Sequence, residues 1–224
     1  MKLKTIAVIP ARGGSKRLPN KNILHLANLP LLAHTILYAK QQKAYIDEVY
    51  VSTDDAEIKK IAVEYGAVVI DRPAALSGDL EPTISCVQHV LEVLDTTVEN
   101  VVLLQVTNPL RPNNLFFEAF TKFNASLSDS LFTVSRNHQK LGTIKNSQFL
   151  PFNYEIGQRS QDLEPLYFEN GLLYITKAKT IQQGTIISQS AFPFVVDHPF
   201  ALVDIDTQED FEYAEYLYHK YNLK

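Results

Sequence analysis

A short loop near the start of the chain carries two glycines and four cations, a composition suited to binding phosphate. It follows the apolar residues that end at Ile9 and reads PARGGSKRLPNKN from Pro10 to Asn22. We expect Gly13 and Gly14 to take positive φ, so that consecutive amides can bind an anion. Charge that neutralises phosphate comes from Arg12, Lys16, Arg17 and Lys21. The loop matches neither the Walker A motif nor GxGxxG, and it predicts a triphosphate site of another kind.

A pair of carboxylates near the other end of the chain is suited to holding a divalent cation. Asp204 and Asp206 follow residues 201–203, which we expect to form a strand. Side chains two residues apart emerge on the same face of an extended chain. Such a pair can hold Mg²⁺ or Mn²⁺ together with waters and substrate phosphates, and Asp206 can also orient a metal-bound base. The plainer interpretation is an acidic helix start before Thr207.

The surrounding pattern predicts the elements that position these residues. Short β-branched runs at 5–9, 48–52, 67–70 and 101–105 are typical of buried strands. Amphipathic helices are expected after Pro30, after an Asp54 or Asp55 cap, at 83–94, at 114–123, and after a Thr207–Asp210 capping box. This alternation predicts an α/β fold, a Rossmann-like, mostly parallel sheet flanked by helices, as one domain over residues 1–224. Gln105 then stands at the carboxyl end of a strand, where open sheets bind ligands.

The stretch from 141 to 165 interrupts this pattern. It is rich in Asn, Gln, Ser, Pro and Gly, with scattered aromatic residues and no clear period. We expect an irregular excursion, within 141–170, that forms a dimer contact or a lid. A plain surface loop is an equally good interpretation.

Composition excludes several classes of protein. The 224 residues carry a formal net charge of −4, which argues against a binder of nucleic acid that depends on a broad basic face. No stretch reaches the roughly 18 apolar residues of a membrane helix, and the apolar segment behind the first residues is too short for a signal peptide. The single cysteine excludes an internal disulfide. We therefore expect a cytoplasmic protein with no membrane partner.

The loop sequence IPARGGSKRLPNKN resembles the signature of the acylneuraminate cytidylyltransferases, which comprise the CMP-sialic, CMP-legionaminic and CMP-pseudaminic acid synthetases. Further matching motifs span nearly the whole chain: STDD at 52–55, Arg72-Pro73, Leu76-Ser77 with Asp79, LLQVTNPLR at 103–111, RSQDL at 159–163, Glu169-Asn170-Gly171 with Tyr174, and Asp204-Ile205-Asp206. The resemblance implies the fold of the nucleotide-diphospho-sugar transferases. It also implies transfer of CMP from CTP to a 2-keto sugar acid, with Mg²⁺ as cofactor and a homodimer as the assembly.

The same resemblance implies a set of site residues. Lys21, Arg12 and Asp206 would be catalytic, and Asp204 and Asp206 would hold the metal. The sugar would contact Gln105, Arg159 and Tyr174. CTP would contact Arg12, Gly13, Gly14, Ser15, Lys16, Lys21, Asn22, Arg72, Ser77 and Asp79.

Several alternatives remain open from the sequence. The eight-carbon Kdo and the pseudaminate synthetases share the chemistry, whereas a glycosyltransferase with a DxD motif would use a different reaction. A nucleotide-binding regulatory protein would catalyse no reaction. At single positions, Arg72 is either a nucleotide contact or a surface salt bridge, and Arg111 either binds an anion or fixes the loop after Pro109.

Overall fold

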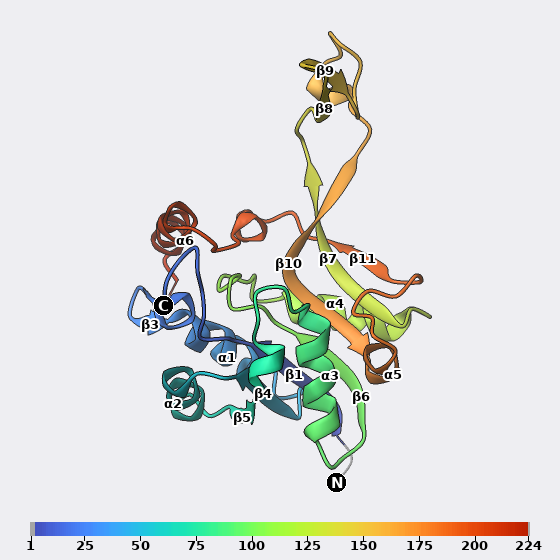
Figure 1. Ribbon diagram of the computed structural model, residues 1–224. Coiled ribbons are helices and arrows are strands. Elements are labelled where there is room, and N and C mark those ends of the chain that lie inside the picture. The colour runs from blue at the N-terminus through green and yellow to red at the C-terminus, as the bar shows by residue number, and fades with distance from the viewer. Residues whose placement is uncertain (1–2, 224) are drawn as a thin grey trace.

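The computed structural model describes residues 3–223, and a seven-stranded sheet forms its centre (Figure 1). Its strands in spatial order are β11 (Phe192–Val195), β7 (Ser130–Asn137), β10 (Leu166–Lys177), β6 (Val98–Leu103), β1 (Leu3–Pro10), β4 (Glu48–Thr53) and β5 (Val68–Asp71). Within this sheet β10 pairs antiparallel with both of its neighbours, and the other pairings are parallel. The predicted mostly parallel sheet is confirmed.

Helices cover both faces of the sheet because successive side chains of each strand point to opposite faces. In β1, Ile6 and Val8 join one apolar cluster while Ala7 and Ile9 join another. The first cluster is covered by α3 (Thr83–Val93) and α5 (Ala178–Gln182). The second is covered by α1 (Leu31–Gln41), α2 (Ala56–Glu64), α4 (Leu115–Ala125) and α6 (Gln208–Lys220). The predicted α/β class is therefore confirmed as three layers.

Local signals in the sequence fix several helix ends. Asp55 caps α2 by accepting from the amides of Glu57 and Ile58, each at 2.9 Å. Gly66 follows that helix with φ +76°, a conformation that favours glycine. Thr207 and Asp210 form the expected capping box at the start of α6.

The prediction of a strand at 201–203 is wrong. Pro199–Leu202 forms a 3₁₀ turn, η4, instead. Pro199 suits the first position of such a turn, and the preceding His198 accepts from the amide of Phe200 at 3.2 Å. The segment that carries Asp204 and Asp206 is therefore a loop between this turn and α6. Other short elements are η1 (Lys21–Ile23), β2 (His25–Leu26), β3 (Leu29–Pro30) and η2 (Ala74–Leu76).

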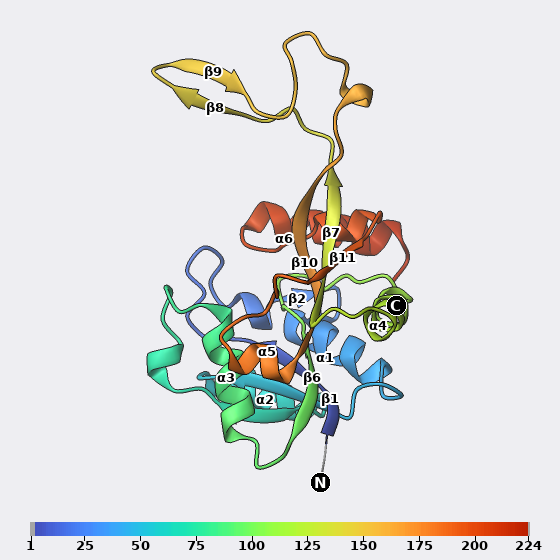
Figure 2. The same ribbon diagram turned by 90° about the vertical axis from the view of Figure 1, so that its right-hand side faces the viewer.

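Residues 138–165, which we call the arm, project far from the sheet beyond the ends of β7 and β10 (Figures 1 and 2). The arm is more regular than its sequence suggested, because it contains the hairpin β8 (Gly142–Lys145) and β9 (Gln148–Pro151) and the turn η3 (Ser160–Asp162). Its large apolar side chains are exposed: Leu141, Ile144, Phe149, Leu150, Phe152 and Ile156. Across residues 3–223, no helix has the length and apolar character needed to cross a membrane.

Candidate active site

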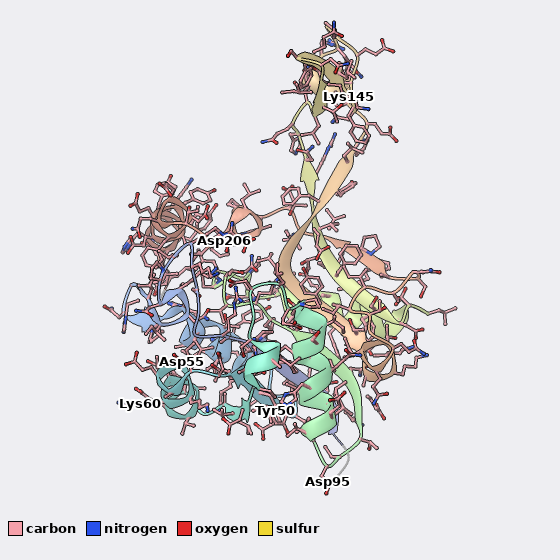
Figure 3. The ribbon with its side chains drawn as sticks, in the orientation of Figure 1. Tyr50, Asp55, Lys60, Asp95, Lys145 and Asp206 are labelled. Atoms are coloured by element: carbon pink, nitrogen blue, oxygen red, sulfur yellow. The ribbon has the colours of Figure 1, made fainter. Side chains whose placement is uncertain are left out.

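The order of the strands determines where the site lies. From β1 the chain adds β4 and β5 on one side of the sheet and then places β6 on the other side of β1. The loops after β1 and β6 therefore diverge at the carboxyl ends of these strands, which is where open α/β sheets form a ligand crevice. A crevice of about 660 Å³ occupies this position, lined by residues of both loops, including Arg12, Lys21 and Gln105. In Figure 3, Asp206 lies at mid-height, between Lys145 of the projecting hairpin at the top and Asp95, shortly before β6, at the bottom.

The glycine loop is built differently from our expectation. Neither Gly13 nor Gly14 has positive φ. The amide of Gly13 donates to the Asp54 carboxylate at 3.1 Å, so it is not free to bind an anion. A Cβ at Gly13 would lie 2.8 Å from the Asp55 carboxylate, whereas one at Gly14 would meet nothing within 4 Å. Glycine is therefore needed at 13 for close packing against the cap of α2, not for an unusual backbone conformation.

The cations of the loop face the crevice through specific partners. Lys21 Nζ lies 2.8 Å from both Asp206 Oδ1 and the carbonyl oxygen of Ile205. Arg17 reaches the other oxygen of Asp206 at 2.8 Å. Asn22 is buried and donates to the carbonyl of Arg12 at 2.8 Å, which fixes the loop beneath them. The glycine loop and the Asp206 segment, 185 residues apart, thus meet across the crevice.

Asp79 also lines the crevice and pairs with two more of the cations. Its carboxylate pairs with Arg12 at 2.9 Å and also with Lys16. The hydrogen bond from Lys16 is the main cause that holds the pKa of Asp79 below its usual range. Arg12 also donates to the carbonyl of the neighbouring Ser77 at 3.4 Å.

Arg72 lines the crevice from the end of β5. It is buried, and its guanidinium donates to two oxygens of Ser52: the hydroxyl at 3.1 Å and the backbone carbonyl at 2.5 Å. A surface salt bridge is therefore the wrong interpretation of this residue. The described acidic side chains form no ion pair with it, and its guanidinium contributes positive charge to the lining of the crevice.

Asp204 lies beside Asp206 and next to the loop after β6. Although Asp204 is exposed, partial burial of its carboxyl raises the pKa of that group above the usual value. A hydrogen bond from the Thr107 hydroxyl opposes this rise, and the negative charge of Asp206 adds to it. Of the two carboxylates, Asp206 is already paired with Lys21 and Arg17. Residues 3–223 contain no cluster of three or more acidic, His or Cys side chains that could hold a metal unaided.

Two carboxylates suit Mg²⁺, which keeps several waters and takes phosphate oxygens as further ligands. The donor set at Asp204 and Asp206 therefore fits a metal that arrives with a nucleotide. It does not fit an all-protein metal cage.

A second cavity, of about 460 Å³, adjoins the crevice and shares Pro82, Thr83 and Gln105 with it. Tyr174, within the buried part of β10, lines this cavity and donates to Glu169 at 2.5 Å. Burial, followed by the contact with Glu169, raises the pKa of the Tyr174 phenol, which stays protonated. The arrangement offers one space for a triphosphate and another for a second substrate.

A family model described as "Cytidylyltransferase" matches residues 6–223. The chain belongs to the cytidylyltransferase family. It is 34% identical over 227 residues to the pseudaminic acid cytidylyltransferase of Campylobacter jejuni, covering 96% of this chain and 97% of the relative. It is 32% identical over 216 residues to the N-acylneuraminate cytidylyltransferase of Streptococcus agalactiae, covering 93% of this chain and 52% of the relative. The predicted resemblance to this family is confirmed.

The cytidylyltransferase fold is shared with more distant structures. The solved structure of CMP:2-keto-3-deoxy-manno-octonic acid synthetase complexed with CTP superimposes with a TM-score of 0.73. At 17% identity over 97% of this chain and 99% of that one, this likeness concerns the fold alone. The enzyme class, nucleotidyltransferase, follows from the family.

Arg111 fixes the loop after Pro109 in this cytidylyltransferase. Its buried guanidinium donates to the carbonyls of Leu172 and Gln105, each at 2.8 Å, and to Thr35 at 3.4 Å. Burial lowers its pKa to about 10, so it stays charged at neutral pH. Of our two interpretations, the structure favours the one in which Arg111 fixes the loop.

Most predicted site residues of the cytidylyltransferase meet at the two cavities. Arg12, Ser15, Lys16, Lys21, Asn22, Arg72, Asp79, Gln105 and Asp206 line the crevice, and Tyr174 lines the second cavity. Gly13, Gly14, Ser77 and Asp204 adjoin these residues without lining either space. Arg159 lies apart, exposed on the arm and paired with Asp162 at 2.7 Å.

Sequence reasoning missed part of the cytidylyltransferase site. Glu169 had a signal, because it lies within one of the matching motifs next to Tyr174. Thr107 lay within another such motif. Ile186 and Ile187, which line the second cavity, had none, because a pair of isoleucines reads as core.

Proposed function

We propose that this cytidylyltransferase transfers CMP from CTP to a nine-carbon 2-keto sugar acid, releasing pyrophosphate. The observation that carries the proposal is the meeting of Lys21 and Asp206 across a crevice rimmed by Arg12, Lys16 and Arg72. These cations suit a triphosphate, and the adjoining cavity with Gln105 and Tyr174 suits the sugar. The relatives named above act on sugars of this class.

The reaction is an in-line displacement at the α-phosphorus of CTP. The C2 hydroxyl oxygen of the sugar forms a bond to the α-phosphorus while the bond from the α-phosphorus to the bridging oxygen of the β-phosphate breaks. The electron pair of the broken bond leaves with pyrophosphate, and the hydroxyl proton passes to solvent. Lys21 and Arg12 offset the negative charge that grows on the phosphate oxygens. Gln105 orients the sugar. Asp206 and Asp204 would hold Mg²⁺, which supplies charge neutralisation at the phosphates.

The direct test is a panel of substrates. Incubation of the protein with CTP, Mg²⁺ and sialic, legionaminic, pseudaminic or Kdo acid is expected to release pyrophosphate with at least one nine-carbon acid. Replacing CTP with UTP or ATP is expected to abolish most of the release. Absence of pyrophosphate with every acid would remove the proposed reaction, and transfer of a sugar from a nucleotide sugar would favour the glycosyltransferase alternative.

We further propose that two copies assemble so that the arm of one covers the site of the other. Two observations support this assembly: the apolar side chains of the arm are exposed, and Arg159, on the arm, lines neither cavity of its own chain. In a dimer of this kind Arg159 would bind the sugar carboxylate of its neighbour through two parallel hydrogen bonds. Within one chain it has only Asp162 as partner among the described residues.

Mixing two inactive variants tests this assembly. Arg159→Ala and Lys21→Ala homodimers are both expected to be weak, because each lacks one part of every site. Unfolding and refolding them together should restore about a quarter of wild-type turnover, since about half of the dimers are then mixed and each mixed dimer carries one complete site of its two. Pyrophosphate release is the readout, with each variant refolded alone as control. No recovery in mixed dimers, with dimers confirmed by light scattering, would place Arg159 outside the neighbouring site.

A further inference from the structure

The residues that line the second cavity indicate which kind of sugar it can hold. It shares Pro82, Thr83 and Gln105 with the nucleotide crevice, so one substrate pair can span both spaces. Under the proposed function, on which this inference rests, the C2 hydroxyl that attacks the α-phosphate lies near Gln105. The remainder of the sugar then extends into the second cavity.

One wall of this cavity is apolar and held in place. Ile84 of α3, Leu103 of β6 and the pair Ile186 and Ile187 line it, and all four belong to or pack against the apolar cluster on that face of the sheet. Two hydrogen bonds hold the backbone of the isoleucine pair in place. The carbonyl of Ile186 accepts from the Thr176 hydroxyl at 2.7 Å, and the amide of Ser188, directly after the pair, donates to the Ser130 hydroxyl at 2.8 Å. The wall is therefore formed before a substrate arrives.

The polar groups of the cavity limit how the sugar can lie. Glu169 lines it, and one of its oxygens already accepts from the Tyr174 hydroxyl. A carboxylate repels the acid group of the sugar, which must therefore point away from Glu169. The remaining lone pairs of Glu169 can accept an amide N–H from the substrate.

We propose that the second cavity selects a 2-keto sugar acid whose tail carries an N-acyl group and ends in a methyl, and disfavours one whose tail carries three hydroxyls. A hydroxyl placed against the isoleucine wall loses water and finds no acceptor there. A methyl or the methyl of an acyl group gains contact with the same wall. The acyl N–H is a donor for Glu169. The specificity-determining residues are thus Ile186, Ile187 and Glu169.

Two sugar acids with the same ring stereochemistry test the proposal. N,N′-diacetyllegionaminic acid carries an acetamido group at C7 and a methyl at C9, where N-acetylneuraminic acid carries hydroxyls. The ratio of their kcat/KM values, measured by pyrophosphate release with CTP and Mg²⁺, is expected to favour the first by roughly 10- to 100-fold. Pseudaminic acid, with the same substituents and different stereochemistry, forms a third arm, and preference for it over N-acetylneuraminic acid also supports the proposal.

A substitution in the apolar wall tests whether that wall causes the preference between the two sugar acids. Ile187→Thr keeps the branched shape and adds a hydroxyl, so it should narrow the ratio several-fold, chiefly by raising turnover of N-acetylneuraminic acid. Val63→Thr, a similar change on the exposed surface of α2, should leave the ratio unchanged.

The possible results separate the two proposals. Equal use of both tails, or preference for the hydroxylated one, overturns the inference and leaves the proposed function standing. No pyrophosphate with any acid overturns both. Should Ile187→Thr fail to fold, the wild-type ratio still decides.

Discussion

Lys21→Ala is expected to lower kcat about 10²- to 10³-fold while the fold survives. The Lys21 side chain is only 13% exposed, and its ammonium lies at the crevice end where the α-phosphate is expected to react. A fixed charge in a partly dry site stabilises developing negative charge without reorganising, and alanine removes it. Steady-state pyrophosphate release measures the loss, and thermal melting followed by circular dichroism checks that the variant is folded.

Arg17→Ala is the matched control for this result. Arg17 pairs with the same Asp206 carboxylate at 2.8 Å, but its side chain is 72% exposed, so we expect at most a few-fold loss. Equal losses in the two variants would mean that Lys21 acts only by holding Asp206. Near-normal turnover of Lys21→Ala would remove Lys21 from the mechanism.

Asp206→Asn is expected to lower turnover about 100-fold and to raise the Mg²⁺ concentration needed for half-maximal activity. The change removes one of two carboxylates proposed to hold the metal and leaves Lys21 and Arg17 without their shared partner. The measurement is pyrophosphate release across a Mg²⁺ titration after treatment of the protein with a chelator. Asp204→Asn should shift the titration in the same direction.

Asp71→Asn controls for the loss of a carboxylate as such. Asp71 pairs with Lys59 at 2.6 Å, and its side chain is 81% exposed. Asp71→Asn should need the same Mg²⁺ concentration as the wild type for half-maximal pyrophosphate release. An unchanged metal requirement in both Asp206→Asn and Asp204→Asn would show that the metal is held elsewhere or is not used.

The sequence predicted the fold correctly where residues close together in the chain determine the local structure. The alternation of Ile6, Ala7, Val8 and Ile9 between the two faces reflects a strand buried on both sides, and such runs are easily recognised. The caps at Asp55 and Thr207 depend on residues three positions away or fewer. The strand expected at 201–203 failed because Pro199 and His198 form a turn that an apolar run does not reveal.

The candidate site was readable only in part, because its geometry depends on contacts between distant residues. The cations of the loop were evident, but their pairing with Asp79 joins segments more than 60 residues apart. Asn108 is another case. Buried in the loop after β6, it donates to the carbonyls of Val203 at 2.7 Å and Asn170 at 3.3 Å, and so ties three segments together. No local pattern marks an asparagine for this role.

The pairing of Asp79 with Arg12 and Lys16 has a consequence for how the nucleotide enters. Before CTP arrives, two of the cations proposed to grip its phosphates already share a carboxylate of their own chain, which offsets part of their charge. Entry of the triphosphate is then an exchange of one anion for another, and only a ligand with several phosphate charges offsets the loss of the internal pair. Inorganic phosphate and nucleoside monophosphates, which carry less charge, compete poorly for such a crevice, and the enzyme remains available to its substrate in a cell rich in small anions.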